Sequence, residues 1–451
     1  MHSTGRNRTR PGVALCGQKA IALAGSLAAV LLAQPGSAAK LSVLHSFCAK
    51  GGCPDGGDPT SEPLIDSSGT LYGTTILGGG HGGGAIYRLR FDPGTGKWKH
   101  TTLYGFCTKV HCRDGIDPAG RLIADVNGNL YGTTVAGGRN EANGSVFELM
   151  PQDAHWKLKT LYRFCAKVDC GDGSQPSSGL TYQGADSGAP YDGVSPLYGE
   201  TQRGGSADQG VVYSLQPAVG KSFWSEQVLH AFCTETEECG LSDGSLPTGG
   251  LRVDGSGNLY GATAGGGENF SGTIFELSAG QRAKWKERIL YSFCPAGCSD
   301  GQSPTGIIRD ELGNLYGTTV GMGANGKGGT LFKLATDGTF TVLHNFCAEL
   351  DCADGHQPGA APLLDSAGNL FGTTVIGGGN DNQEGQLGGG VVYRLSAGGQ
   401  FTMLHAFCAK ADCRDGQAPF AGLTMDPDGH LFGVTNNGGK FLGGVVYEVT
   451  P

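Results

Sequence analysis

Seven aspartates at one repeated position are the first residues of this sequence whose type and spacing could do chemistry. Each follows a pair of cysteines and precedes a glycine: Asp55, Asp114, Asp172, Asp243, Asp300, Asp354 and Asp415. If the strands that follow them surround one axis, the seven carboxylates ring one mouth of a central channel and favour cations, calcium among them, or polyhydroxy ligands. The alternative is that each aspartate caps its own turn by accepting backbone N–H bonds.

A second set of charged residues occurs where the repeats differ from one another. Its members are Arg139, Glu200, Arg203, Asp381 and Glu384. Glu200 stands where other repeats carry threonine. We expect all five on the face that carries the aspartates, as part of a binding site; the alternative is that they lie in variable solvated loops.

Catalytic motifs are missing from the sequence. No nucleophile elbow, zinc-protease motif, EF-hand loop or phosphate-binding loop occurs, so we assign no catalytic residue and favour a binding protein over an enzyme. The alternative is an extracellular carbohydrate-active enzyme, a polysaccharide lyase or hydrolase, that uses Glu200 and a second carboxylate. The acid and base of glycosidases lie about 5–10 Å apart, which gives that alternative a test.

Fourteen of the fifteen cysteines form one pair per repeat. The pairs are Cys48/Cys53, Cys107/Cys112, Cys165/Cys170, Cys233/Cys239, Cys294/Cys298, Cys347/Cys352 and Cys408/Cys413. Short local disulfides in an oxidising compartment are predicted, because a zinc ion needs four ligands and a ring keeps the pairs apart. Histidines two residues before a Phe-Cys dipeptide alternate with tyrosines there, so we interpret them as packing residues and predict no metal site.

The elements that position these residues follow from internal repeats. Leu-Tyr/Phe-Gly and Phe-Cys each recur seven times, and residues 248–293 show the unit, with strands expected at 251–253, 258–263, 273–277 and 285–293. Four short antiparallel strands per unit, with Gly-rich turns between them, are typical of a propeller blade. The sequence therefore predicts an all-β fold, a seven-bladed β-propeller of four-stranded antiparallel blades; a β-solenoid is the alternative.

The ends of the chain predict how the ring closes. Residues 41–47 match the fourth strand of a unit, whereas the chain ends after residues 445–449, which match a third strand. The N-terminal strand is therefore expected to complete the last blade, which leaves no free sheet edge.

The first 39 residues read as a secretory signal, with a basic start, a short apolar stretch and small residues at a cleavage site. A retained anchor is the alternative. The predicted domains are thus a signal peptide at 1–39 and one propeller at 40–451. Without residues 1–39 the chain keeps 28 basic and 41 acidic residues, a net charge of −13 that argues against nucleic acid as a partner. We expect a monomer without stable membrane insertion.

The repeat unit, with its GNLYGTT and GG(A/V)(V/I)(F/Y) segments, resembles the GloVer-type tandem repeat of exported bacterial proteins that carry various surface anchors. The resemblance covers residues 41–451. A weaker similarity to NHL-type propeller repeats concerns the fold alone. The family resemblance implies no settled activity, cofactor or catalytic residue. Because the chain ends at Pro451 directly after the last strand, we expect a secreted or periplasmic protein. We further expect it to bind a protein or glycan ligand.

Overall fold

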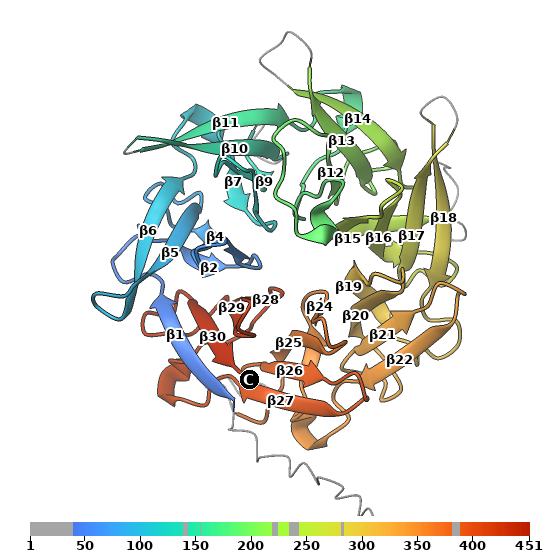
Figure 1. The fold of residues 1–451 in the computed structure, drawn as a ribbon. Helices are drawn as coiled ribbons and strands as arrows, with labels where there is room; N and C mark the ends of the chain where they lie inside the picture. The colour runs from blue at the N-terminus through green and yellow to red at the C-terminus, as the bar shows by residue number, and fades with distance from the viewer. Residues whose placement is uncertain are drawn as a thin grey trace, which may run out of the picture. The chain divides into compact units, whose positions relative to one another are not determined.

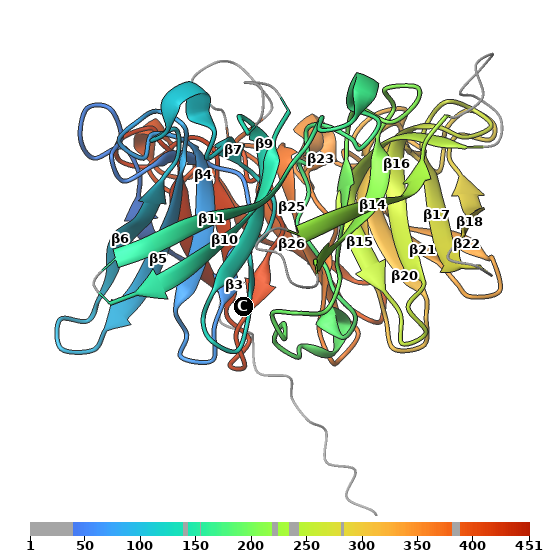
Figure 2. The same cartoon turned by 90° about the horizontal axis from the view of Figure 1, so that it is seen from above.

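A computed structural model describes residues 39–138, 143–153, 155–218, 224–233, 243–280, 284–380 and 388–451. These residues form seven antiparallel sheets around one axis, with the first strand of each sheet innermost (Figures 1 and 2). The predicted seven-bladed β-propeller is therefore confirmed. Within the described ranges, no helical segment has the length and apolar character of a membrane span.

Three blades have a first strand split into two short pieces. Blade 1 contains β2 (Gly57–Pro59), β3 (Leu64–Ile65), β4 (Leu71–Leu77), β5 (Ala85–Asp92) and β6 (Lys97–Gly105). Blade 2 contains β7 (Ile116–Pro118), β8 (Ile123–Ala124), β9 (Leu130–Ala136), β10 (Ser145–Gln152) and β11 (His155–Arg163). Blade 6 contains β23 (His356–Pro358), β24 (Leu363–Leu364), β25 (Leu370–Ile376), β26 (Val391–Leu395) and β27 (Phe401–Ala406).

Blades 4 and 5 have continuous first strands. Blade 4 contains β15 (Gly244–Val253), β16 (Leu259–Gly266), β17 (Thr273–Ala279) and β18 (Trp285–Ser292). Blade 5 contains β19 (Gln302–Arg309), β20 (Leu315–Gly321), β21 (Thr330–Leu334) and β22 (Phe340–Asn345). The four strands expected between residues 248 and 293 are all present, although β15 begins earlier than expected.

Blade 3 lacks a regular first strand. Its sheet has β12 (Leu197–Thr201), β13 (Val211–Pro217) and β14 (Trp224–Ala231). The inner segment pairs with the blade only through isolated bridges, Ser174 with Arg203 and Thr181 with Tyr198. A long insertion, residues 184–195, replaces the tight turn that other blades have here and contains the short helix η3 (Ala185–Ser187).

Blade 7 is built from both ends of the chain. Strand β1 (Lys40–Ser46) pairs with β30 (Val445–Thr450), which pairs with β29 (Leu431–Thr435) and then β28 (Thr424–Met425). The register runs from Lys40 opposite Thr450 to Ser46 opposite Val445. The predicted closure of the ring is confirmed, and Figure 1 shows the first and last strands side by side.

Aromatic contacts between blades explain the repeated motifs. Every phenylalanine of a Phe-Cys dipeptide is fully buried and meets the third-strand aromatic ring of the next blade, with ring centroids 4.9–5.4 Å apart. The third-strand ring in turn covers the glycine of Leu-Tyr/Phe-Gly: a Cβ on Gly73 would overlap the Tyr87 ring, and one on Gly132 the Phe147 ring. Both markers therefore follow from packing, since interiors tolerate little extra volume.

Candidate functional site

The seven aspartates lie beside the outer strands and not at the axis. Each carboxylate bonds the histidine or tyrosine two residues before the Phe-Cys phenylalanine, at 2.7–3.3 Å: His45–Asp55, Tyr104–Asp114, Tyr162–Asp172, His230–Asp243, Tyr291–Asp300, His344–Asp354 and His405–Asp415. Five of them are buried: Asp114, Asp172, Asp300, Asp354 and Asp415. None of the seven, all within the described residues, lines the central cavity. Their predicted place at a channel mouth is therefore wrong.

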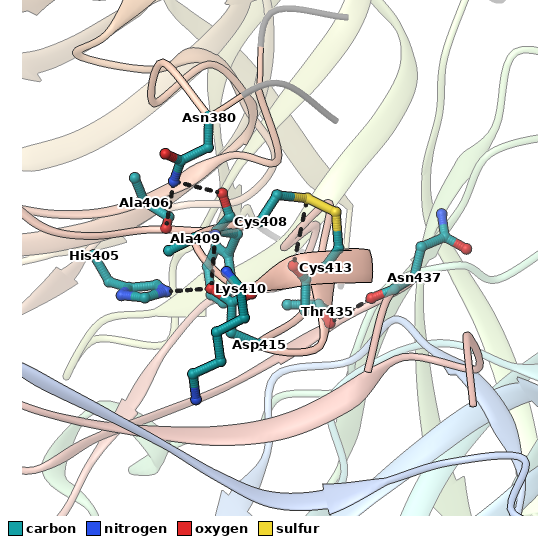
Figure 3. Close-up of a disulfide and its surroundings, with 12 residues drawn as sticks. Asn380, His405, Ala406, Cys408, Ala409, Lys410, Cys413, Asp415, Thr435 and Asn437 are labelled. Atoms are coloured by element: carbon teal, nitrogen blue, oxygen red, sulfur yellow. Dashed lines mark hydrogen bonds and ion pairs between the residues drawn. A yellow bond between two sulfur atoms is a disulfide. The ribbon is translucent and has the colours of Figure 1, made fainter. Parts of the chain in front are cut away.

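Most of these aspartates also hold the loop that follows the outer strand. Asp415, for example, accepts backbone N–H bonds from Ala409 and Lys410 besides its contact with His405 (Figure 3). Burial by itself would raise the pKa of Asp415, but the hydrogen bonds from His405 and the loop bring it below the ordinary value. The sequence did not anticipate the bond between the ring and the aspartate. Whether these carboxylates also bind calcium stays a prediction.

Each of these loops carries a disulfide where the structure describes both cysteines. Six predicted pairs are joined: Cys48–Cys53, Cys107–Cys112, Cys165–Cys170, Cys294–Cys298, Cys347–Cys352 and Cys408–Cys413. Cys233 is disulfide-bonded too, and its predicted partner Cys239 lies outside the described residues. Six such bonds indicate an oxidising environment outside the cytoplasm.

The five variable charged residues do not form one cluster on a loop face. Glu200 lies within β12 and is 1% exposed, so it does not lie on an exposed face of the propeller; a part in ligand binding stays a prediction. Arg203 is exposed and forms an ion pair with Asp208 at 3.7 Å. The remaining three, Arg139, Asp381 and Glu384, lie outside the described residues.

Glu200 instead connects two blades just behind the innermost strands. Its Oε1 accepts hydrogen bonds from Ser178 Oγ at 2.6 Å and from the backbone N–H of Gly250 at 2.9 Å, while Oε2 is buried without a partner. Burial raises the pKa of Glu200 to about 7, although both hydrogen bonds and the charge of Arg252 act in the opposite direction.

A cavity of about 280 Å³ lies on the axis and is lined by residues of all seven blades. Its wall consists largely of glycine, serine, threonine and alanine, with three charged side chains: Glu62, Arg121 and Arg252. Glu62 pairs with Arg121 at 3.3 Å. Among the described residues, the Arg252 side chain donates one hydrogen bond, a long one of 3.4 Å, to the carbonyl of Leu251. The sequence held a signal for this cluster, since Arg121 precedes the first-strand leucine where other repeats carry glycine or proline.

The insertion of blade 3 adds a carboxylate to this cluster. Burial raises the pKa of Asp186, in η3, and the nearby guanidinium groups of Arg252, Arg309 and Arg121 lower it. The Nε atom of Arg309 is buried without a hydrogen-bond partner. Arg121 and Arg252 thus line the cavity beside Glu62, and the charge of Arg309 also acts on nearby Asp186, an arrangement that attracts anions.

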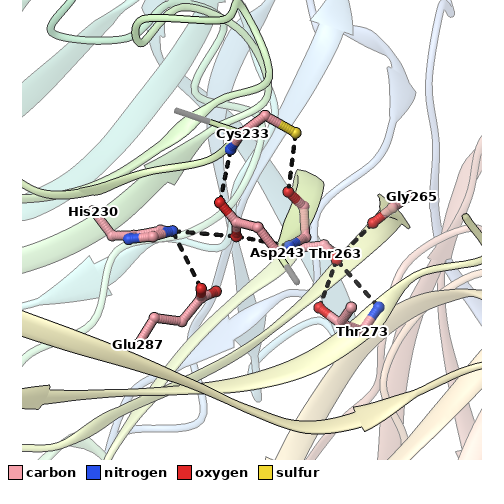
Figure 4. A network of polar contacts seen from close by, with 8 residues as sticks. His230, Cys233, Asp243, Thr263, Gly265, Thr273 and Glu287 are labelled. Carbon is pink, nitrogen blue, oxygen red and sulfur yellow. Dashed lines mark hydrogen bonds and ion pairs between the residues drawn. The ribbon is translucent and has the colours of Figure 1, made fainter. Parts of the chain in front are cut away.

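A second polar cluster lies at the junction of blades 3 and 4, far out on the blades. His230, Asp243 and Glu287 each place one potential metal-ligand atom within 4.8 Å of the others (Figure 4). Burial and the neighbouring carboxylate of Asp243 raise the pKa of Glu287 to about 9. Asp243 is among the candidate site residues predicted from the sequence, whereas Glu287 is not. Glu287 lies in blade 4 and His230 in blade 3, so the sequence of one repeat does not show that they meet.

Comparisons with known proteins agree with the fold. The family model described as the Gloeobacter/Verrucomicrobia repeat matches residues 30–252 and again 247–451. No curated protein matches the chain.

Solved structures resemble the chain only distantly. A luciferin-regenerating enzyme shares 13% identity over 92% of this chain and 95% of its own, with a TM-score of 0.40. A gluconolactonase from Xanthomonas campestris shares 15% over 74% and 85%, with a TM-score of 0.39. A sialidase from Trypanosoma rangeli shares 9% over 91% and 59%, with a TM-score of 0.43. Similarities this low carry no argument about activity.

Proposed function

The chain belongs to the Gloeobacter/Verrucomicrobia repeat family, and we propose that it is an exported binding module whose ligand site is the central cavity. The observation that carries the proposal is the arginine cluster at the cavity. Within the part of the chain that the structure describes, the guanidinium group of Arg252 donates only one long hydrogen bond, and Arg121 has a single ion-pair partner, Glu62. Guanidinium groups with free donors bind carboxylates in a bidentate manner.

The rest of the wall favours a small ligand with hydroxyl groups. Ser178, Thr248 and Thr305 line the cavity together with glycine backbone, so its wall offers both hydrogen-bond donors and acceptors. The volume of about 280 Å³ lies at the lower end of the range of small-molecule sites, roughly 300–1,000 Å³. A monosaccharide acid, such as a uronate, combines the negative charge, the hydroxyl groups and the size.

Isothermal titration with glucuronate and glucose tests the proposal. We expect saturable binding of glucuronate, weaker binding of glucose, and a loss of affinity of at least tenfold in Arg252→Gln and in Arg121→Gln. Arg288→Gln is the matched control. Arg288 lies on the outer strand β18 and forms an ion pair with Glu276, so this substitution should leave binding unchanged. Absence of glucuronate binding, or wild-type affinity in both cavity variants, would refute the proposal.

A second candidate is a carbohydrate-active enzyme that uses Glu200. The pKa of about 7 suits a general acid at neutral pH. A glycosidase mechanism with an acid and a base also needs a second carboxylate near Glu200. The charged side chain that affects the pKa of Glu200 is instead an arginine, Arg252. Release of reducing ends or unsaturated products from a uronate-containing polysaccharide, abolished by Glu200→Gln, would favour the enzyme over the binding module.

A further inference from the structure

The junction between blades 3 and 4 contains a largely buried glutamate that forms no ion pair with a lysine or arginine among the described residues. At several junctions, two side chains from the outer strands of neighbouring blades meet. The first is the histidine or tyrosine two residues before the Phe-Cys of one blade, and the second lies six residues before the Phe-Cys phenylalanine of the next blade. That second residue is aromatic and stacks on the ring in three cases, with centroids 4.0–4.3 Å apart: His45 with His100, Tyr291 with Phe340 and His344 with Phe401. At the junction of blades 3 and 4, it is Glu287, which faces His230.

The geometry of this cluster suits a metal ion. His230 Nε2 lies 3.3 Å from Asp243 Oδ1 and 3.6 Å from Glu287 Oε2 (Figure 4). Ligand atoms of a tetrahedral zinc site, with bonds of about 2.0–2.2 Å, lie about 3.3–3.6 Å from one another. Both distances from His230 match that spacing, and all three ligand atoms lie within 4.8 Å of one another.

The charge of the cluster also calls for a cation. Among the described residues, no lysine or arginine forms an ion pair with Asp243 or Glu287, and Glu287 Oε1 is buried without a hydrogen-bond partner. The equivalent glutamate of blade 3, Glu226, is instead neutralised by Lys167 at 2.7 Å. Two neighbouring carboxyl groups that are largely buried are costly to ionise together, and a divalent ion removes that cost.

Other contacts hold the ligands in place and leave room for water. Asp243 accepts backbone N–H bonds from Cys233 and Gly244, both at 2.7 Å, which fix the orientation of its carboxylate. The side chains of His230, Asp243 and Glu287 remain 19%, 18% and 12% exposed, so solvent reaches the cluster.

We propose that His230, Asp243 and Glu287 bind one divalent transition-metal ion, with zinc as the best match, and that water completes its coordination. An imidazole nitrogen beside two carboxylate oxygens suits zinc, whereas calcium takes six to eight oxygen ligands. The ion joins the outer strand of blade 3, which carries His230, to that of blade 4, which carries Glu287. This site is separate from the central cavity and does not depend on the function proposed for it.

Titration of the chelator-treated, untagged protein with ZnCl₂ tests the site. We expect one saturable site by calorimetry, a melting temperature that rises with zinc concentration, and at least tenfold weaker binding in both His230→Gln and Glu287→Gln. Two variants serve as matched controls and should bind zinc as the wild type does: His344→Gln, the equivalent histidine against an aromatic ring, and Glu226→Gln, the equivalent glutamate beside a lysine.

Three outcomes overturn the proposal. They are the absence of saturable zinc binding, zinc binding that both ligand variants retain, and stabilisation by calcium but not by zinc. Circular dichroism and melting in EDTA establish that each variant is folded, and if Glu287→Gln does not fold, His230→Gln decides the question alone.

Discussion

Glu200 shows how one substitution changes the role of a repeated position. In four other blades a threonine stands there and donates its hydroxyl to the innermost strands, as Thr133 does to the carbonyl of Ser178 and Thr373 to that of Ala421, both at 3.0 Å. Glu200 accepts hydrogen bonds at the same place, from Ser178 and Gly250. The inner strands remain tied to the second strand, but a carboxyl group is now buried behind the cavity wall.

The raised pKa of Glu200 predicts how stability depends on pH. Because the folded-state pKa of about 7 exceeds the ordinary value of 4.5, the protonated carboxyl stabilises the fold fully below pH 4.5, and this contribution is lost as the pH rises to 7 and beyond. The loss amounts to about 3 kcal/mol. Glu200→Gln should therefore be more stable than the wild type at pH 8 and similar to it at pH 4.5.

Urea unfolding of both proteins between pH 4.5 and 8 measures this difference. Glu268→Gln, at an exposed glutamate, is the control and should follow the wild type at every pH. A constant difference between Glu200→Gln and the wild type across this range would contradict the raised pKa.

At the scale of elements, each blade depends on its neighbours for burial. The phenylalanine after one outer strand packs on the third strand of the next blade, and strand β1 brings Phe47 onto Tyr87 of blade 1 in the same way. Strand β1 therefore covers the edge of β30 and also supplies one of the seven aromatic contacts that join the ring.

Deletion of residues 40–47 should expose the β30 edge and remove Phe47 from the core. We expect a large drop in melting temperature together with aggregation, because an unpaired strand edge and a vacated aromatic site appear at once. Thermal melting with light scattering measures both effects, and a variant that begins at Ala39 is the control. A monomeric deletion variant with the melting temperature of the control would show that the ring does not need this strand.

At the scale of the whole molecule, the insertion of blade 3 breaks the symmetry of the ring. Its Tyr191 is fully buried, and the backbone of Tyr191 forms hydrogen bonds with Ala124 and Val126 of blade 2. Gln183, the residue before the insertion, donates a hydrogen bond to the carbonyl of Gly255 in blade 4. The insertion thus spans three blades beside the axis and brings Asp186 to the arginines of the cavity.

Asp186 should compete with an anionic ligand for these arginines. Asp186→Asn is expected to raise the affinity for glucuronate about fivefold at low salt, since one charge at close range contributes on the order of 1 kcal/mol and salt screens it. Asp192→Asn is the control, because Asp192 lies in the same insertion but binds Val194 and Ser195. Calorimetry at two salt concentrations measures the effect, and an unchanged or lower affinity in Asp186→Asn would argue against a carboxylate ligand at this site.

The sequence by itself determined the blade count, the strand order, the closure and the described disulfides. These features follow from patterns within one repeat: the glycine of Leu-Tyr/Phe-Gly must make room for an aromatic ring one strand away, and cysteines four or five residues apart are close enough for a local bond. The place of β1 followed from counting strands, because Leu41–Phe47 and Val445–Val449 each match only one position in the unit.

Only the tertiary structure decided which side chains meet across blades. Asp415 and its equivalents were expected at the axis, yet each turns outward to a ring ten or so residues before it. Glu200 meets Gly250, and His230 meets Glu287, at sequence separations of 50 and 57 residues. Such contacts depend on the rotation of one blade relative to the next, and a repeat pattern gives the order of strands but not that rotation. The candidate ligand groups therefore emerge at the junctions between blades, where no single repeat contains the whole site.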